Sequence, residues 1–193
     1  MFPSVPEELR MRLNTSIGFM NDSLAPVTLT LIFDNIEQDT GVKFFLVGRD
    51  YPWHCTLQEG VAAEPDLFFD AEGVELVRRI EQVLSATTIV YSQLLIDCGN
   101  VLLNAAYVPD EIINARQQLS AYYEQRGIRP LPMEDILHCT LARIRTLPKR
   151  FRPKKYINHI LEVREAILAT PVDLNIKRLF CGTAYQLLTL SAR

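Results

Sequence analysis

The sequence predicts an α+β fold built from duplicated antiparallel β-sheets with flanking helices. Many short apolar stretches follow one another with too little chain between them for a crossover helix, which favours antiparallel strands. The tetrapeptide His-Cys-Thr-Leu also occurs twice, first at His54 and again at His138, each time in a strand-like stretch that precedes a helical one. We therefore expect a pseudo-two-fold molecule that arose by internal duplication.

The chain is long enough to bury a sizeable core. It has 193 residues, of which 48% are hydrophobic and 22% charged, as in an ordinary globular protein. We expect one bilobal domain over residues 1–193, with lobes centred on residues 54–56 and 138–140 and a central cleft. The net charge of −3 excludes binding of a polyanion by bulk attraction, so any contact with nucleic acid requires a local basic patch.

The first half of the chain is expected to contain three strands and two helices. Strands are predicted over residues 16–21, 42–48 and 52–60, and helices over residues 25–39 and 71–85. The stretch VKFFLVG is apolar, aromatic and β-branched, which is typical of a strand. Pro26 suits the first turn of the first helix and Gly41 can end it, while apolar residues recur at close to helical spacing in the second.

The second half repeats this rhythm. Strands are predicted over residues 88–97 and 101–106, within the stretch RPLPMEDILHCTLARI after a loop, and over residues 172–180 and 184–190. Helices are predicted over residues 109–125 and 156–168, and Gly127 is a natural cap after the first of them. The last two strands are expected to lie on either side of Cys181 and Gly182.

No export signal or membrane span is predicted. The N-terminus lacks a basic start followed by an apolar run, and the most apolar long window, residues 88–108, contains too many polar side chains for a span. That window fits two buried strands better. The four cysteines form no C-x-x-C pair, so we expect reduced thiols in a cytoplasmic protein.

The repeated tetrapeptide divides into a reactive face and a packing face. Side chains alternate along a strand, so His54 and Thr56 share one face while the cysteine and the leucine share the other. The same alternation places His138 and Thr140 together. The cysteines then act as small apolar packing residues.

Two such strands brought together would place two imidazoles and two hydroxyls in one cleft, a set suited to phosphate ester chemistry. One neutral imidazole can take a proton from water while a protonated one gives a proton to a leaving oxygen. The hydroxyls can bind the charged phosphate oxygens. This chemistry requires no metal and no other cofactor, and the sequence has no clustered metal ligands. His159 lies in a predicted helix and is interpreted as half-exposed and without a functional role.

These paired H-x-T motifs resemble those of the two-histidine (2H) phosphoesterase superfamily over nearly the whole chain. The sequence is most similar to the branch of 2′-5′ RNA ligases or RNA 2′,3′-cyclic phosphodiesterases, through the stretches HCTLARI and GTAYQLL. The resemblance implies a bilobal α+β fold with a central cleft, with His54 and His138 as acid and base. It assigns the phosphate and substrate contacts to Thr56, Thr140, Arg143 and Tyr185.

Three positions near the motifs bear on this resemblance. Simple alternation places Arg143 on the cysteine face, unless a β-bulge after Thr140 redirects it. The equivalent position after the first threonine is often aromatic in this branch, but here it is Glu59, whose charge would repel a nucleic-acid phosphate. Trp53 directly precedes the first motif and is expected to pack in the core.

The segment from Arg143 to Lys155 is basic and contains no acid. Its cations are Arg143, Arg145, Lys149, Arg150, Arg152, Lys154 and Lys155. It either contacts an RNA backbone beside the cleft or forms a solvated loop held by its prolines, and the sequence leaves both interpretations open. Phe151 and Tyr156 could stack bases, although such residues are more often packed in a core.

The sequence thus predicts a monomeric, cofactor-free enzyme that opens 2′,3′-cyclic phosphates on RNA ends or small nucleotides to 2′-phosphates. One alternative is the same site acting on a 2′-5′-linked oligonucleotide or on a cyclic phosphate derived from ADP-ribose, including reverse ligation; Glu59 keeps this open. Another is an RNA- or nucleotide-binding module without turnover, against which the presence of both histidines and both threonines argues. The sequence does not decide which histidine is the acid.

Overall fold

The computed structural model describes residues 12–19, 24–61, 70–97, 99–133 and 136–184, which hold eight strands and four helices. In chain order these are β1 (Arg12–Phe19), α1 (Leu24–Thr40), β2 (Lys43–Leu46), β3 (His54–Val61), α2 (Ala71–Leu84), β4 (Thr88–Asp97), β5 (Asn100–Ala105), α3 (Asp110–Gln125), β6 (Arg129–Pro130), β7 (His138–Thr146), α4 (Pro153–Ala169) and β8 (Val172–Ala184). The predicted α+β class is confirmed.

The strands form one antiparallel sheet that closes on itself. Their order is β2-β7-β5-β4-β8-β1-β3-β6, and an additional pairing joins β7 to β3. The strands from β7 to β3 in this order therefore make a closed ring. β2 pairs with β7 outside that ring, and β6 pairs with β3 in the same way.

The element order repeats once along the chain. The series β1-α1-β2-β3-α2-β4 is followed by β5-α3-β6-β7-α4-β8, which has the same order of strands and helices. Each half of the sheet mixes strands from both series: β2 and β4 lie with β5 and β7, whereas β6 and β8 lie with β1 and β3. The duplication therefore exchanges strands between the two lobes.

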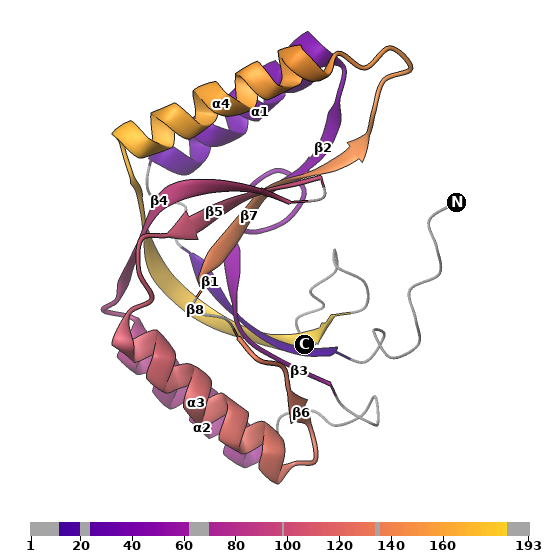
Figure 1. Ribbon diagram of the computed structural model, residues 1–193. Coiled ribbons are helices and arrows are strands. Elements are labelled where there is room, and N and C mark those ends of the chain that lie inside the picture. The colour runs from indigo at the N-terminus through magenta and orange to yellow at the C-terminus, as the bar shows by residue number, and fades with distance from the viewer. Residues whose placement is uncertain (1–11, 20–23, 62–69, 98, 134–135, 185–193) are drawn as a thin grey trace.

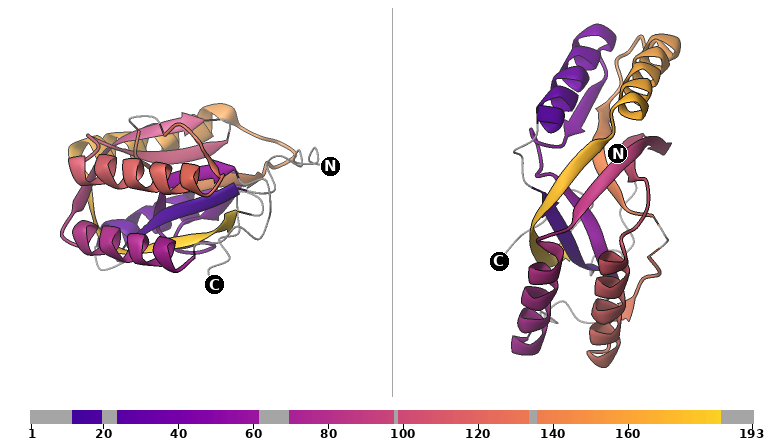
Figure 2. Two further views of the ribbon diagram at one scale, coloured as in Figure 1. Left: turned by 90° about the horizontal axis from the view of Figure 1, so that it is seen from below. Right: turned by 90° about the vertical axis from the view of Figure 1, so that its left-hand side faces the viewer.

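The helices of the described chain form two pairs at opposite ends of the sheet (Figure 1), with α1 beside α4 and α2 beside α3. Figure 2 shows the same separation from two further directions. Asp39 joins the first pair, because its carboxylate lies 2.5 Å from Lys155 Nζ and 2.6 Å from His159 Nε2. None of these helices is long and apolar enough to span a membrane.

Local chemistry explains where the helices begin and end. Asp70 caps α2 by accepting a hydrogen bond from the Gly73 backbone nitrogen at 2.9 Å. Gly41 and Gly127 follow α1 and α3 with φ values of 74° and 70°, a left-handed conformation that glycine adopts without strain. Pro153 begins α4, three residues earlier than the apolar periodicity predicts, because proline fits the first helical turn.

One prediction about the strands was wrong. Residues 172–184 form one continuous strand through Cys181 and Gly182, because Gly182 pairs with Asn14 of β1 and does not break the ladder. The strand predicted over residues 184–190 lies almost entirely outside the described residues. The sequence also gave no sign of β6, a two-residue strand that contains a proline and lies at the edge of the sheet.

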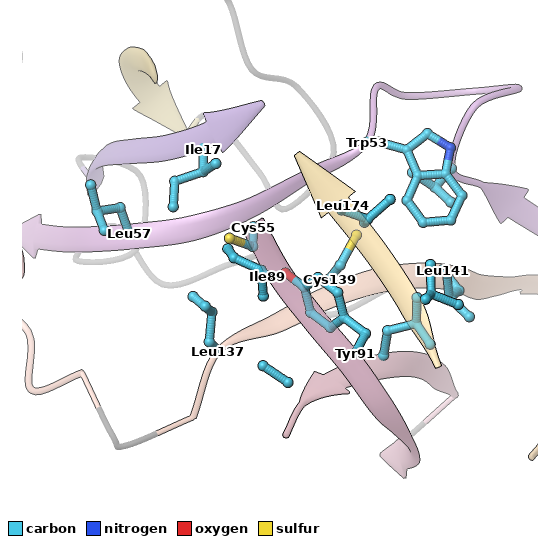
Figure 3. Close-up of a cluster of buried hydrophobic side chains, with 14 of the residues drawn as sticks. Ile17, Trp53, Cys55, Leu57, Ile89, Tyr91, Leu137, Cys139, Leu141 and Leu174 are labelled. Atoms are coloured by element: carbon cyan, nitrogen blue, oxygen red, sulfur yellow. The ribbon is translucent and has the colours of Figure 1, made fainter. Parts of the chain in front are cut away.

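The core occupies the space between the motif strands and the strands opposite them. Figure 3 shows Cys55 and Cys139 in one cluster of buried side chains with Tyr91 of β4 and Leu174 of β8. These side chains are at most 1% exposed. Trp53 is 3% exposed, so its predicted place in the core is confirmed.

Candidate active site

The two H-x-T motifs lie on strands that pair directly. Cys55 of β3 and Cys139 of β7 are register partners in an antiparallel bridge. In this register the histidine of each motif lies level with the threonine of the other. Motifs 84 positions apart in the sequence therefore meet at one point of the sheet.

The cysteine and the histidine faces of the motifs differ as predicted. Both cysteines and both leucines of the repeat are buried to 1% exposure or less. His54, Thr56 and His138 are half-buried, and Thr140 is 8% exposed. Burial raises the pKa of the Cys55 thiol to about 12 and that of Cys139 further, so both thiols stay protonated and serve packing.

A β-bulge follows each motif and redirects the residues after it. On β7, Thr140 pairs with Leu102 and Ala142 with Val101, which leaves Leu141 as the extra residue. The bulge turns Ala142 into the core, where it is 0% exposed, and brings Arg143 to the face of His138 and Thr140. The strand therefore contains the β-bulge that Arg143 needs in order to lie on the same face as His138.

The same bulge occurs on β3 at the equivalent place. Thr56 pairs with Ser16 and Gln58 with Thr15, so the extra residue is Leu57. Gln58 is then buried at 1% exposure and Glu59 comes to the histidine face. Glu59 is thus the structural counterpart of Arg143, with the opposite charge.

His54 is held in one orientation by its own loop. Its Nδ1 lies 2.7 Å from the Pro52 carbonyl oxygen, which can only accept, so Nδ1 carries the hydrogen. Nε2 is consequently the nitrogen that can exchange a proton with a substrate. The ring of Tyr51 packs edge-on against the imidazole, with centroids 5.9 Å apart.

Both motif histidines are disposed to be neutral. Burial lowers the pKa of His54, although its hydrogen bond to Pro52 opposes the shift, and the Arg143 cation lowers it further. Burial also lowers the pKa of His138, followed by the charges of Arg143, Arg116 and His54. We therefore expect the charge of Arg143 to act on both imidazoles, and the charge of His54 to act on His138.

Two residues near the motifs were not singled out from the sequence. Tyr51 donates a hydrogen bond from its hydroxyl to the Thr140 carbonyl at 3.2 Å, which joins the loop before β3 to β7. Arg116 of α3 is 8% exposed and donates to the carbonyls of Leu57 and Ile136, both at 3.0 Å. No sequence signal distinguishes this arginine from the surface cations of other helices.

The remaining candidates from the sequence lie elsewhere or are outside the described residues. His159 is 27% exposed between α1 and α4, as expected of a half-exposed helix residue. Tyr156 is 9% exposed and packs against Phe44 and Phe151, so it is a core residue and does not stack bases. Tyr185 lies outside the described residues.

The basic segment is mostly exposed, but two of its cations have partners. Lys155 pairs with Asp39, and the Arg145 guanidinium lies 5.2 Å from the ring centroid of Phe45. Contact of this segment with RNA stays a prediction. No group of three or more His, Cys, Asp or Glu side chains in the described ranges could hold a metal ion.

Comparison with known proteins bears on the fold. No protein-family model and no curated protein sequence matches the chain. Among solved structures, the chain is similar to the crystal structure of the MHV ns2 PDE domain, with a TM-score of 0.52 and 11% identity over 90% of this chain and 98% of that chain. At this identity the likeness concerns the fold alone. The chain therefore shares the α+β fold of this PDE domain.

Proposed function

We propose that the protein is a 2H phosphoesterase that hydrolyses 2′,3′-cyclic phosphates, on RNA ends or small nucleotides, to 2′-phosphates. The meeting of the two H-x-T motifs carries this proposal. Their strands pair at Cys55 and Cys139, and their histidines and threonines share the opposite face. Packing does not require four polar motif side chains to converge at one point, whereas a site that binds a phosphate and protonates the leaving oxygen does.

The reaction needs one proton acceptor and one proton donor. A water oxygen attacks phosphorus opposite the 3′ oxygen and gives its proton to the neutral histidine. The bond from phosphorus to the 3′ oxygen breaks, and the other histidine donates its proton to that oxygen. The product keeps the 2′ ester, and the two histidines exchange protons with solvent before the next cycle.

The local electrostatics support these roles. A pKa below the ordinary value makes an imidazole neutral near pH 7, which the proton acceptor must be. The negative charge of a bound phosphate raises the pKa of its neighbours, so the second histidine can hold a proton in the complex. Arg143 and the threonine hydroxyls would bind the charged phosphate oxygens.

Replacing each motif histidine separately tests this function. We expect His54→Ala and His138→Ala each to lower kcat on adenosine 2′,3′-cyclic phosphate by about 10² to 10⁴-fold, because each removes one proton transfer. His159→Ala is the matched control, since the third histidine lies between α1 and α4. Product analysis should show the 2′-phosphate. Wild-type turnover in either motif variant would refute the two-histidine mechanism.

A second candidate is the same site acting on another phosphodiester, such as a 2′-5′-linked oligonucleotide or a cyclic phosphate derived from ADP-ribose, including ligation in reverse. Glu59 keeps this candidate open, because its carboxylate occupies the position equivalent to Arg143 and the substrate can therefore differ from an ordinary RNA end. Parallel assays on these substrates and on an RNA with a cyclic phosphate end would decide between them. Tight binding of all of them with no product would instead indicate a binding module.

A further inference from the structure

Phe180 of β8 lies on the same face of the sheet as the motif histidines. Its register partner is Ser16 of β1, and the partner of Ser16 on β3 is Thr56. Register partners on adjacent strands project to the same face. A row of residues therefore leads from Thr56 to Phe180 over two strand spacings, about 10 Å.

A glycine leaves room for the Phe180 ring to lean toward the motif. In the adjacent row, Arg178 of β8 opposes Gly18, and Gly18 opposes His54. A Cβ atom at Gly18 would collide with the Phe180 ring, so the ring lies directly over this glycine. The phenyl ring thus lies over Gly18, which is the register partner of His54.

Arg178 forms a second layer on this ring. Its guanidinium carbon lies 4.2 Å from the ring centroid of Phe180, which is cation–π distance. Phe180 is half-buried and Arg178 is exposed, so the outer layer faces solvent. Aromatic rings and guanidinium planes are the surfaces on which unpaired bases stack in nucleic-acid sites.

We propose that Phe180 and Arg178 form a nucleobase subsite beside the phosphate site. The base of the substrate stacks on this layered pair while its phosphate lies between His54 and His138. This proposal rests on the proposed function and deepens it, because it names the side chains that bind the base of the substrate. The Phe180 backbone lies two strand spacings from Thr56, about 10 Å, and its ring leans toward the motif over Gly18.

Equilibrium binding of two phosphates tests the subsite without depending on turnover. Adenosine 2′-phosphate carries the base, and ribose 2-phosphate lacks it. We expect Phe180→Leu to weaken binding of adenosine 2′-phosphate by about 5- to 100-fold, the usual effect of removing one stacked base contact. Binding of ribose 2-phosphate should change less than about two-fold, and Phe180→Trp should retain the preference for the base.

A second arginine-capped phenylalanine provides the matched comparison. Phe45 of β2 opposes Arg143, and Arg145 lies over its ring. Phe45→Leu should leave the ratio of the two dissociation constants unchanged. The proposal is overturned if Phe45→Leu removes the base preference instead, if Phe180→Leu weakens both ligands equally or neither, or if the wild type does not bind adenosine 2′-phosphate.

Failure of the base subsite can be distinguished from failure of the proposed reaction. If the wild type hydrolyses no cyclic phosphate but still prefers the base through Phe180, the reaction is wrong and the subsite stands. If the wild type hydrolyses cyclic phosphates and Phe180→Leu leaves the base preference intact, the reaction stands and the subsite is wrong.

Discussion

Arg143 and Glu59 give opposite charges to two equivalent positions. Each follows a motif threonine by three residues and a bulged leucine by two, so the two strands present them in the same way. A phosphate is attracted at the Arg143 end and repelled at the Glu59 end. Under the proposed function, the repeated strands would therefore form an asymmetric site, in which a substrate has one preferred orientation.

Removing the Arg143 charge should affect both rate and pH dependence. We expect Arg143→Met to lower kcat/KM by about 10² to 10³-fold. Removing one group that stabilises a developing oxyanion has an effect of this size in other enzymes. Because burial and then Arg143 lower the histidine pKa values, the variant should reach its optimum at higher pH than the wild type.

The pH–rate profile of Arg143→Met against that of Arg145→Met measures this effect. Arg145 is a suitable control because its guanidinium lies over Phe45. An unchanged optimum in Arg143→Met would place Arg143 outside the electrostatic reach of the histidines.

At the scale of elements, Arg116 connects α3 to both motif strands. It donates one hydrogen bond to the bulge carbonyl of Leu57 on β3 and another to Ile136, two residues before His138. Under the proposed function, Arg116 would be a positioning residue, because it bonds to the backbone beside both motifs and, after burial and Arg143, its charge lowers the pKa of His138.

Replacing Arg116 should lower both the stability of the fold and the rate of the chemical step. We expect Arg116→Met to reduce the free energy of unfolding by about 3 kcal/mol, because hydrogen bonds from a charged donor are each worth about 1.5 to 3 kcal/mol. In the folded fraction, kcat should fall more than KM rises, and the optimum should move to higher pH, since Arg116 lowers the pKa of His138. Denaturant unfolding and kinetics at several pH values measure both effects. A wild-type kcat and optimum in the folded variant would leave Arg116 with a structural role alone.

Strand alternation was enough to predict which motif residues face the core, but it fails after Thr56 and Thr140. A bulge changes the parity of a strand without changing the kind of residue it contains, so Leu57 and Leu141 look like ordinary packing positions in the sequence. The pairing of β3 with β7 is non-local, and only the repetition of the tetrapeptide pointed to it. Arg116 is buried by tertiary contacts that helical periodicity does not record.

At the scale of the whole molecule, the two repeats depend on each other. β2 and β4 of the first repeat lie in the sheet beside β5 and β7 of the second, and β6 and β8 lie beside β1 and β3. Neither repeat alone can complete a lobe, because each would leave sheet edges and apolar faces exposed.

This exchange of strands predicts complementation between fragments. We expect fragments 1–97 and 99–193 to show no cooperative thermal unfolding alone, and to recover it, with activity, when they are refolded together. Circular dichroism and the cyclic phosphate assay measure this. Cooperative unfolding of either fragment by itself would show that a repeat is an independent folding unit.

In the proposed mechanism, two histidines from the two repeats share one acid–base reaction. Its most direct test is the pH dependence of kcat/KM for adenosine 2′,3′-cyclic phosphate, which reports the ionisation of the free enzyme. We predict a bell-shaped profile with its maximum below pH 6.5, since the pKa values of both histidines are lowered by burial. The residual activity of His54→Ala and of His138→Ala should each lack one limb of the bell. A profile that keeps both limbs in either variant would contradict the two-histidine mechanism.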